Sequence, residues 1–156
     1  MSGRLPIERT AEGDVRVWLS GGERALIREA FAHLHERLQG DLDDPALERL
    51  FPLAYENAPE DEAEYRRLTH HELLASRMEA LRMVEKTLDE ATIDQAQAGV
   101  WLGAMNDLRL VLGTELDVTE DALGLPLDRA DPKARELALY TYLSWLQELL
   151  VEAVSP

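Results

Sequence analysis

The sequence predicts a mainly α-helical fold: a single-domain helical bundle over residues 1–156, with a small N-terminal β-hairpin in residues 1–19, a helical part in residues 20–156 and a central buried helix. Three observations predict it. The length of 156 residues fits one compact domain. Apolar residues recur at helical spacing in four long stretches, and only the first 19 residues alternate as strands do.

The hairpin is predicted from alternating apolar and polar residues on both sides of residues 11–13. The apolar positions are Leu5 and Ile7 before the turn and Val15, Val17 and Leu19 after it. Pro6 has no backbone N–H to donate, so it confines the first strand to a sheet edge. Ser20 and Glu23 then form an S-x-x-E capping box, which predicts a helix from there to about Gln39. The predicted inward stripe of this helix is Ile27, Ala30, Phe31, Leu34 and Leu38.

The middle of the chain is predicted to hold a short helix and two longer ones. The short helix covers residues 46–51. Thr69 and Glu72 form a second capping box, of the T-x-x-E type, which indicates a helix start inside an otherwise helical stretch. We therefore expect one helix over residues 60–68 and a separate one from residue 70 to about residue 90.

The central helix is predicted over residues 93–113, with Thr92 as its N-cap. At 100° per residue its side chains divide between two faces, each mainly apolar. One face holds Trp101, Ala104, Met105, Leu108, Val111 and Leu112, and the other holds Leu102, Gly103, Asn106, Leu110 and Gly113. A helix that is apolar on both sides has no face left for solvent, so we expect it in the interior of the fold.

Three polar residues, Asn106, Asp107 and Arg109, are set among these apolar positions. Asp107 and Arg109 project about 200° apart, so each must reach a neighbour on its own side of the helix. Arg77 falls inside the apolar stripe of the preceding helix, and we expect it to pair with Asp107. We interpret these residues as buried polar groups that fix helix packing, with ligand binding or recognition as the alternative.

The last helix is predicted to begin at Pro132, because proline favours the first helical position. Its inward stripe is Leu139, Tyr142, Leu143, Leu146, Leu149, Leu150 and Ala153. Further apolar residues lie outside that stripe, and Trp145 lies at its edge. The helix is therefore either deeply buried or part of an exposed apolar surface for a partner protein or a homodimer.

The charge is strongly negative, at −15, and it is concentrated in two regions. Residues 41–64 hold nine acidic residues and one arginine, and residues 87–131 hold ten acidic residues and two arginines. Such a field repels DNA, so we expect no direct nucleic-acid binding. The acidic residues either serve solubility or face a basic protein partner. Asp41, Asp43 and Asp44 are the candidate contacts in the second case.

No motif in the sequence names a reaction. It contains no glycine-rich phosphate loop, no G-x-S-x-G elbow and no dinucleotide fingerprint. His70, His71 and Glu72 are adjacent, and neighbouring helical side chains point about 100° apart, which is awkward for a shared metal ion. We therefore expect neither an enzyme nor a cofactor or metal site. The alternative is a small ligand-binding or enzymatic protein that uses a pocket containing Asn106, Asp107 and Arg109.

The chain contains no cysteine, which excludes disulfides and cysteine-based redox switching within it. No run approaches the ~18 consecutive apolar residues of a membrane span. The first residues also lack the apolar stretch of a signal peptide. From these features we expect a cytoplasmic protein without membrane contact.

The segment from Trp101 to Thr114, with its N-D-L-R-L-x-L-G-T core, resembles the signature of an actinobacterial domain-of-unknown-function family typified by the oxidative-stress regulator AosR. The resemblance extends to the order of elements: a strand entering a helix, an acidic middle, a Tyr65-Arg-Arg-Leu-Thr69 segment, and a final Leu/Trp-rich helix that includes Trp145. It covers most of the chain.

This resemblance implies a regulator of transcription in stress that contacts a sigma factor or another RNA polymerase component. The family's genes commonly lie beside the gene of the ClpS adaptor, so an adaptor linked to Clp proteolysis is the alternative. In the typical member, cysteines sense oxidation. This chain has none, so that mechanism does not transfer to it.

Overall fold

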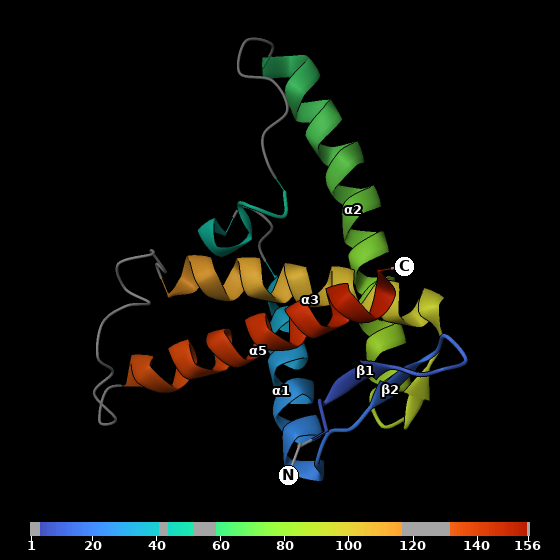
Figure 1. Cartoon of the computed structure of the whole chain (residues 1–156). Helices are drawn as coiled ribbons and strands as arrows, with labels where there is room; N and C mark the ends of the chain where they lie inside the picture. The colour runs from blue at the N-terminus through green and yellow to red at the C-terminus, as the bar shows by residue number, and fades with distance from the viewer. Residues whose placement is uncertain (1–3, 41–43, 52–58, 117–131, 156) are drawn as a thin grey trace.

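A computed structural model describes residues 4–40, 44–51, 59–116 and 132–155. The elements follow the order β1 (Ile7–Arg9), β2 (Val15–Val17), α1 (Gly21–Gln39), η1 (Pro45–Leu47), α2 (Pro59–Thr87), β3 (Thr92–Ile93), α3 (Gln95–Glu115) and α5 (Pro132–Val154). Four long helices and a small sheet confirm the mainly α-helical prediction (Figure 1).

The N-terminal hairpin forms as predicted, with Ile7 opposite Val17 in an antiparallel pair. β3 adds a third antiparallel strand to β2, with Val15 opposite Ile93, which the sequence did not predict. The sheet order β1-β2-β3 leaves β1 at an edge, as the proline before it requires. A two-residue strand carries too little periodicity to be recognised, because it forms only when the chain returns to the hairpin.

Helix α1 begins at the predicted capping box. Ser20 accepts a hydrogen bond from the backbone N–H of Glu23, and the Glu23 carboxylate accepts one from the N–H of Ser20. The predicted inward stripe is buried without exception: Ile27, Ala30, Phe31, Leu34 and Leu38. Gly40 follows as the C-cap. After α1, the expected short helix over residues 46–51 is a 3₁₀ helix, η1, that covers only Pro45–Leu47.

Helix α2 is continuous from Pro59 to Thr87, so the prediction of two helices with a break at Thr69 is wrong. An S/T-x-x-E pattern also arises by chance inside helices, and no glycine or proline interrupts this one. Figure 1 shows the N-terminal half of α2 rising away from the other helices. Its C-terminal half packs into the core through Leu81 and Val84.

Helix α3 is capped by Asp94, which corrects the prediction of Thr92. Asp94 and Gln97 form a reciprocal capping box, and Thr92 belongs to β3. Asp94 accepts from the N–H of Gln97 at 2.7 Å. A D-x-x-Q pattern satisfies the same backbone donors as S-x-x-E, so this signal was available in the sequence.

Helix α3 packs against both α2 and α5 and also touches α1, which supports its central position. The face centred on Leu108 is buried throughout. The opposite face is only partly buried: Gly113 is buried, Leu102, Asn106 and Leu110 are half-buried, and Gly103 is exposed. The prediction of complete enclosure is therefore wrong for this face, because α2 diverges from α3 and leaves it partly open.

Helix α5 begins at Pro132, as predicted, and lies across α3 and α1 in Figure 1. Its inward stripe is buried from Leu143 to Ala153, whereas Leu139 and Tyr142 are half-buried. Near the C-terminal end of α5, the carbonyl oxygen of Ala153 accepts a hydrogen bond from the side chain of Gln95 at the start of α3. The same side chain donates to the carbonyl oxygen of Gly13, so it ties the hairpin turn to both helices.

Candidate functional site

Charged side chains of α3 reach three other helices. Asp107 pairs with Arg77 of α2, and Arg109 binds side chains of α5. Glu115 pairs with Arg37 of α1 at 2.9 Å. These contacts place one helix at the centre of the polar connections of the fold, as well as of its apolar core.

The expected pair between Arg77 and Asp107 is present, with 2.5 Å between Arg77 Nη1 and Asp107 Oδ1. Arg77 also donates to the carbonyl oxygen of Leu50 at 3.3 Å, and its guanidinium lies 5.8 Å from the centre of the Phe51 ring. Asp107 is only 8% exposed. Burial raises the pKa of the Asp107 carboxyl, and the neighbouring Arg77 guanidinium opposes that rise in part.

Arg109 lies on the other side of α3, as its position in the sequence predicts. Its Nε donates to Ser144 Oγ at 2.9 Å, and its Nη1 donates to Gln147 Oε1. The guanidinium also lies 5.5 Å from the centre of the Tyr140 ring. Gln147 in turn donates to Asn106 Oδ1 at 3.4 Å, so Asn106 has the partner that it requires.

The predicted polar pocket does not gather all three residues in one cavity. Asn106 and Asp107 line an open groove of about 610 Å³ between α2 and α3, where Arg77 and Gly103 also contribute. Arg109 is absent from its lining and faces α5 instead. The geometry separates the three side chains between two interhelical contacts. Their role, structural or in recognition, stays a prediction.

The surface where α1 and α5 meet presents aromatic and aliphatic side chains. Tyr142 of α5 donates a hydrogen bond of 2.6 Å to Glu23 of α1. Trp145, one turn along, has its ring 6.3 Å from that of Tyr142 and is 44% exposed. Leu26, one turn along α1 from Glu23, is 42% exposed. We call Leu26, Tyr142 and Trp145 the Trp145 surface.

The Tyr142–Glu23 contact shifts the pKa of both groups. The Tyr142 hydroxyl and the backbone of Ser20 donate hydrogen bonds to Glu23, and these lower the pKa of its carboxyl. Burial, together with the Glu23 carboxylate, raises the pKa of Tyr142. Around neutral pH the phenol is therefore a donor to an ionised carboxylate, and the contact holds the N-terminus of α1 against α5.

Of the acidic residues predicted to meet a partner, Asp41 and Asp43 lie outside the described residues. Asp44 is the N-cap of η1, where its Oδ1 accepts from the N–H of Ala46 at 2.9 Å. Its Oδ2 pairs with Arg37 at 3.0 Å. Both carboxylate oxygens of Asp44 therefore have partners within the chain, and a contact with another protein stays a prediction.

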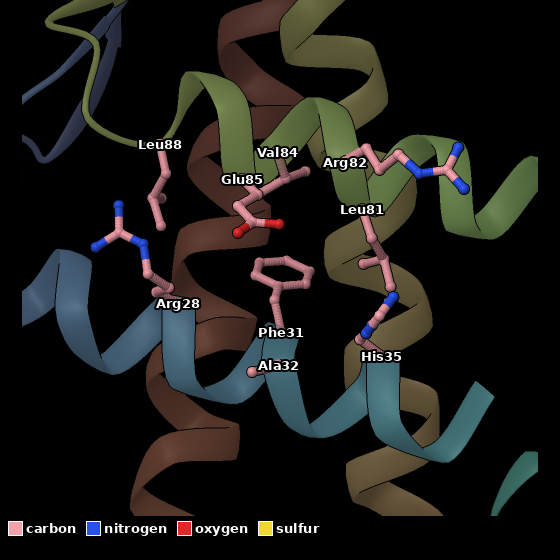
Figure 2. Close-up of a pocket in the computed structure, with 9 residues that line it drawn as sticks. All are labelled: Arg28, Phe31, Ala32, His35, Leu81, Arg82, Val84, Glu85 and Leu88. Atoms are coloured by element: carbon pink, nitrogen blue, oxygen red, sulfur yellow. The ribbon is translucent and has the colours of Figure 1, made fainter. Parts of the chain in front are cut away.

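A cleft of about 260 Å³ opens between α1 and α2 (Figure 2). Its apolar lining comes from both helices: Phe31, Ala32, Leu81, Val84 and Leu88. Charged and polar side chains stand at its rim: Arg28, His35, Arg82 and Glu85. No feature of the sequence singled out this cleft, because it depends on how the two helices cross.

The residues described contain no group of three or more His, Asp or Glu side chains placed to hold a metal ion. His70 packs edge-on against Phe51, with 5.0 Å between ring centres, and His71 is exposed. Over the same part of the chain, no helix has the length and apolar character needed to cross a membrane.

Two buried or half-buried contacts were missed from sequence. Trp101 Nε1 donates to Thr87 Oγ1 at 2.7 Å, which adds a second polar link between α2 and α3. Arg24 donates to the carbonyl oxygens of Val17 and Leu88, so it joins the sheet to the end of α2. Sequence spacing does not predict either contact, because Trp101 and Thr87 are 14 residues apart and lie on different helices, and both partners of Arg24 are backbone carbonyl oxygens.

The model of a family described as a domain of unknown function, DUF2017, matches residues 4–154. The chain belongs to the DUF2017 family. This confirms the resemblance seen in the segment around Asn106 and Arg109. No solved structure matches the chain at a significant level.

A curated relative of this DUF2017 chain is the putative oxidative stress regulator AosR of Mycobacterium leprae. The two are 30% identical over 129 residues, which is 72% of this chain and 59% of that protein. This chain therefore spans about three fifths of the length of that relative. The printed name of that relative describes a regulator, and the description of the family states no function.

Proposed function

We propose that this protein is a non-enzymatic regulator of an oxidative-stress response that acts by binding another protein, a sigma factor or a different RNA polymerase component. The named relative supports the stress response, and the Trp145 surface supports binding to a protein. Because the chain has no cysteine, cysteine oxidation within it is not the signal. An oxidative signal reaches it through its partner or through its abundance.

The observation that carries the proposal is the exposed Trp145. Tryptophan and tyrosine dominate the energies of protein interfaces, because they bury a large area at little cost in side-chain entropy. The Tyr142–Glu23 hydrogen bond fixes the neighbouring ring before a partner arrives. Glu148 and Glu152 are exposed on the same face of α5 as Trp145. An apolar centre with an acidic rim complements a basic, aromatic or aliphatic surface.

The test measures binding of the purified protein to the sigma factors and RNA polymerase subunits of its native host by biolayer interferometry. Trp145→Ala is expected to weaken binding by about 30-fold, the effect of a hot-spot residue. Val151→Ala is the matched control, since Val151 is also 44% exposed but lies about 120° around the same helix. Its affinity should stay within about twofold of the wild type.

The result against this proposal is that no sigma factor or polymerase subunit binds the wild-type protein. Binding of a Clp protease component in its place would support the adaptor function. Tight binding of DNA alone at physiological salt would contradict the argument from charge. Equal losses for the Trp145 and Val151 variants would place the interface away from the Trp145 surface.

A further inference from the structure

The cleft between α1 and α2 is separate from the Trp145 surface. In Figure 2 the side chains that line the cleft come from α1 and α2, and the ribbons of α3 and α5 pass behind these two helices. The buried ring of Phe31 forms its floor, beside Leu81 and Val84. Its volume of about 260 Å³ lies just below the ~300–1,000 Å³ of small-molecule sites. That size suits one long side chain better than a whole metabolite.

The two arginines at the rim already have acidic partners. Arg28 pairs with Asp89, and Arg82 pairs with Glu79, each at 2.7 Å. In Figure 2 the guanidinium of Arg82 extends away from the Phe31 ring. These pairs offset the positive charge at the rim.

Glu85 differs from these neighbours. It is exposed, it lines the cleft, and it forms no ion pair or side-chain hydrogen bond with any residue that the structure describes. In the view of Figure 2 its carboxylate lies between the ribbon of α2 and the Phe31 ring, and both side chains line the cleft. An unpaired carboxylate next to an aromatic ring and aliphatic side chains provides a charge for a cation and an apolar surface for its stem.

We propose that this cleft binds an arginine side chain presented by a protein partner. The aliphatic stem packs on Leu81 and Phe31, and the guanidinium pairs with Glu85. Arginine suits this arrangement better than lysine, because its planar guanidinium stacks on rings and forms two parallel hydrogen bonds to a carboxylate. The net charge of −15 attracts a basic segment and disfavours an amphipathic anion.

The proposal does not depend on which protein binds the Trp145 surface, and it is tested without a partner. The ¹⁵N-labelled full chain is titrated with N-acetyl-arginine methylamide and followed by two-dimensional NMR. The matched probe is the citrulline analogue, which keeps the shape of the side chain and loses its charge. Saturable shifts at the cleft residues are expected with arginine, with a dissociation constant on the order of millimolar.

Two variants test the site itself. Glu85→Gln removes the charge and is expected to weaken binding of the arginine probe at least about threefold. Ala32→Phe fills the cleft from an exposed position of α1 and is expected to abolish the shifts. Its control is Ala25→Phe, an exposed alanine two turns earlier on the same face that does not line the cleft. Unchanged melting temperatures show that the variants remain folded.

Three results would overturn the proposal. The first is no saturable shift at the cleft, and the second is equal binding of the arginine and citrulline probes. The third is shifts spread over acidic surface residues that persist in Ala32→Phe, which would show diffuse attraction to the negative charge only. None of these results bears on binding at Trp145, so failure here is distinguishable from failure of the proposed function.

Discussion

The two sides of α3 are built differently, although one helix supplies both. Toward α5, Arg109 meets Ser144 and Gln147, and a Cβ added to Gly113 would lie 3.3 Å from the Tyr140 ring. Toward α2, a Cβ added to Gly103 would lie more than 4 Å from every neighbouring residue that the structure describes. One side is closely packed, and the other is an open groove crossed by polar links.

The difference teaches that apolar periodicity alone does not say whether a face is covered. Gly103 and Gly113 belong to the same predicted face of α3, yet Tyr140 of α5 lies against Gly113, whereas Gly103 is exposed. On the open side α2 diverges, so the polar pair of Arg77 and Asp107 carries a larger share of that interhelical contact. Substitutions on either side of α3 test whether the two sides respond as their packing requires, and a substitution in α5 tests its contact with α1.

The largest effect is expected on the open side, at Asp107. Asp107→Ala leaves the half-buried Arg77 without its carboxylate and should lower the free energy of unfolding by about 3 kcal/mol, measured by urea denaturation. Asp89→Ala removes an exposed partner of Arg28 and should change the free energy of unfolding by less than about 0.5 kcal/mol. Similar small losses for both variants would show that the Arg77 pair is not a significant contact.

A smaller loss is expected on the closed side. Arg109→Gln removes the contacts of Arg109 with Ser144 and Gln147. It should lower the free energy of unfolding by about 2 kcal/mol, because these are hydrogen bonds from a charged donor. Arg82→Gln, in an exposed pair, is the control and should cost less than about 0.5 kcal/mol. A loss at Arg109 greater than that at Asp107 would reverse the ranking of the two sides.

The contact of α5 with α1 is expected to depend on pH. Tyr142→Phe should cost about 1 kcal/mol at pH 7. The lowered pKa of Glu23 gives stability that is present above its ordinary value of 4.5 and lost as the pH falls through the folded-state value. The raised pKa of Tyr142 gives stability that is present below 10.0 and lost at higher pH. The difference in unfolding free energy between the wild type and Tyr142→Phe should therefore be greatest between pH 4.5 and pH 10.0.

Thermal denaturation across a range of pH measures that difference. A constant difference from pH 3 to pH 11 would show that the ionised Glu23 is not the acceptor that stabilises the contact.

The smallest effect compares two glycines of α3. Gly103→Ala should stabilise the protein by about 0.5–1 kcal/mol, because the site is open and alanine favours helix. Gly113→Ala should stabilise the protein less than Gly103→Ala, since the new methyl group must displace the Tyr140 ring by a few tenths of an ångström. Equal stabilisation of the two variants in urea denaturation would mean that the surroundings of Gly103 and Gly113 are packed alike.

The parts of this fold that could be predicted depend on local rules. The capping box at Ser20, the inward stripe of α1 and the opposite directions of Asp107 and Arg109 all follow from helix geometry. The Arg77 pair followed because a charge inside an apolar stripe requires a partner. The family was also visible in the segment around Asn106.

The rest depends on how the elements meet. The β3 strand forms against a hairpin some 75 residues earlier in the chain, and the Tyr142–Glu23 contact joins helices 119 residues apart. The prediction of a helix start at Thr69 was wrong because many helices begin with a capping pattern, but the pattern alone does not start a helix. The cleft at Glu85 exists only through the crossing of α1 and α2, which no periodicity reveals.

The most direct test of α3 as a helix with two independent sides is a pair of double-mutant cycles on unfolding free energy. The Arg77/Asp107 cycle should give a coupling of about 2 kcal/mol, because the two side chains are in contact. The Asp107/Arg109 cycle should be additive within about 0.5 kcal/mol, although the residues are two positions apart. Coupling in the second cycle equal to that in the first would contradict the account.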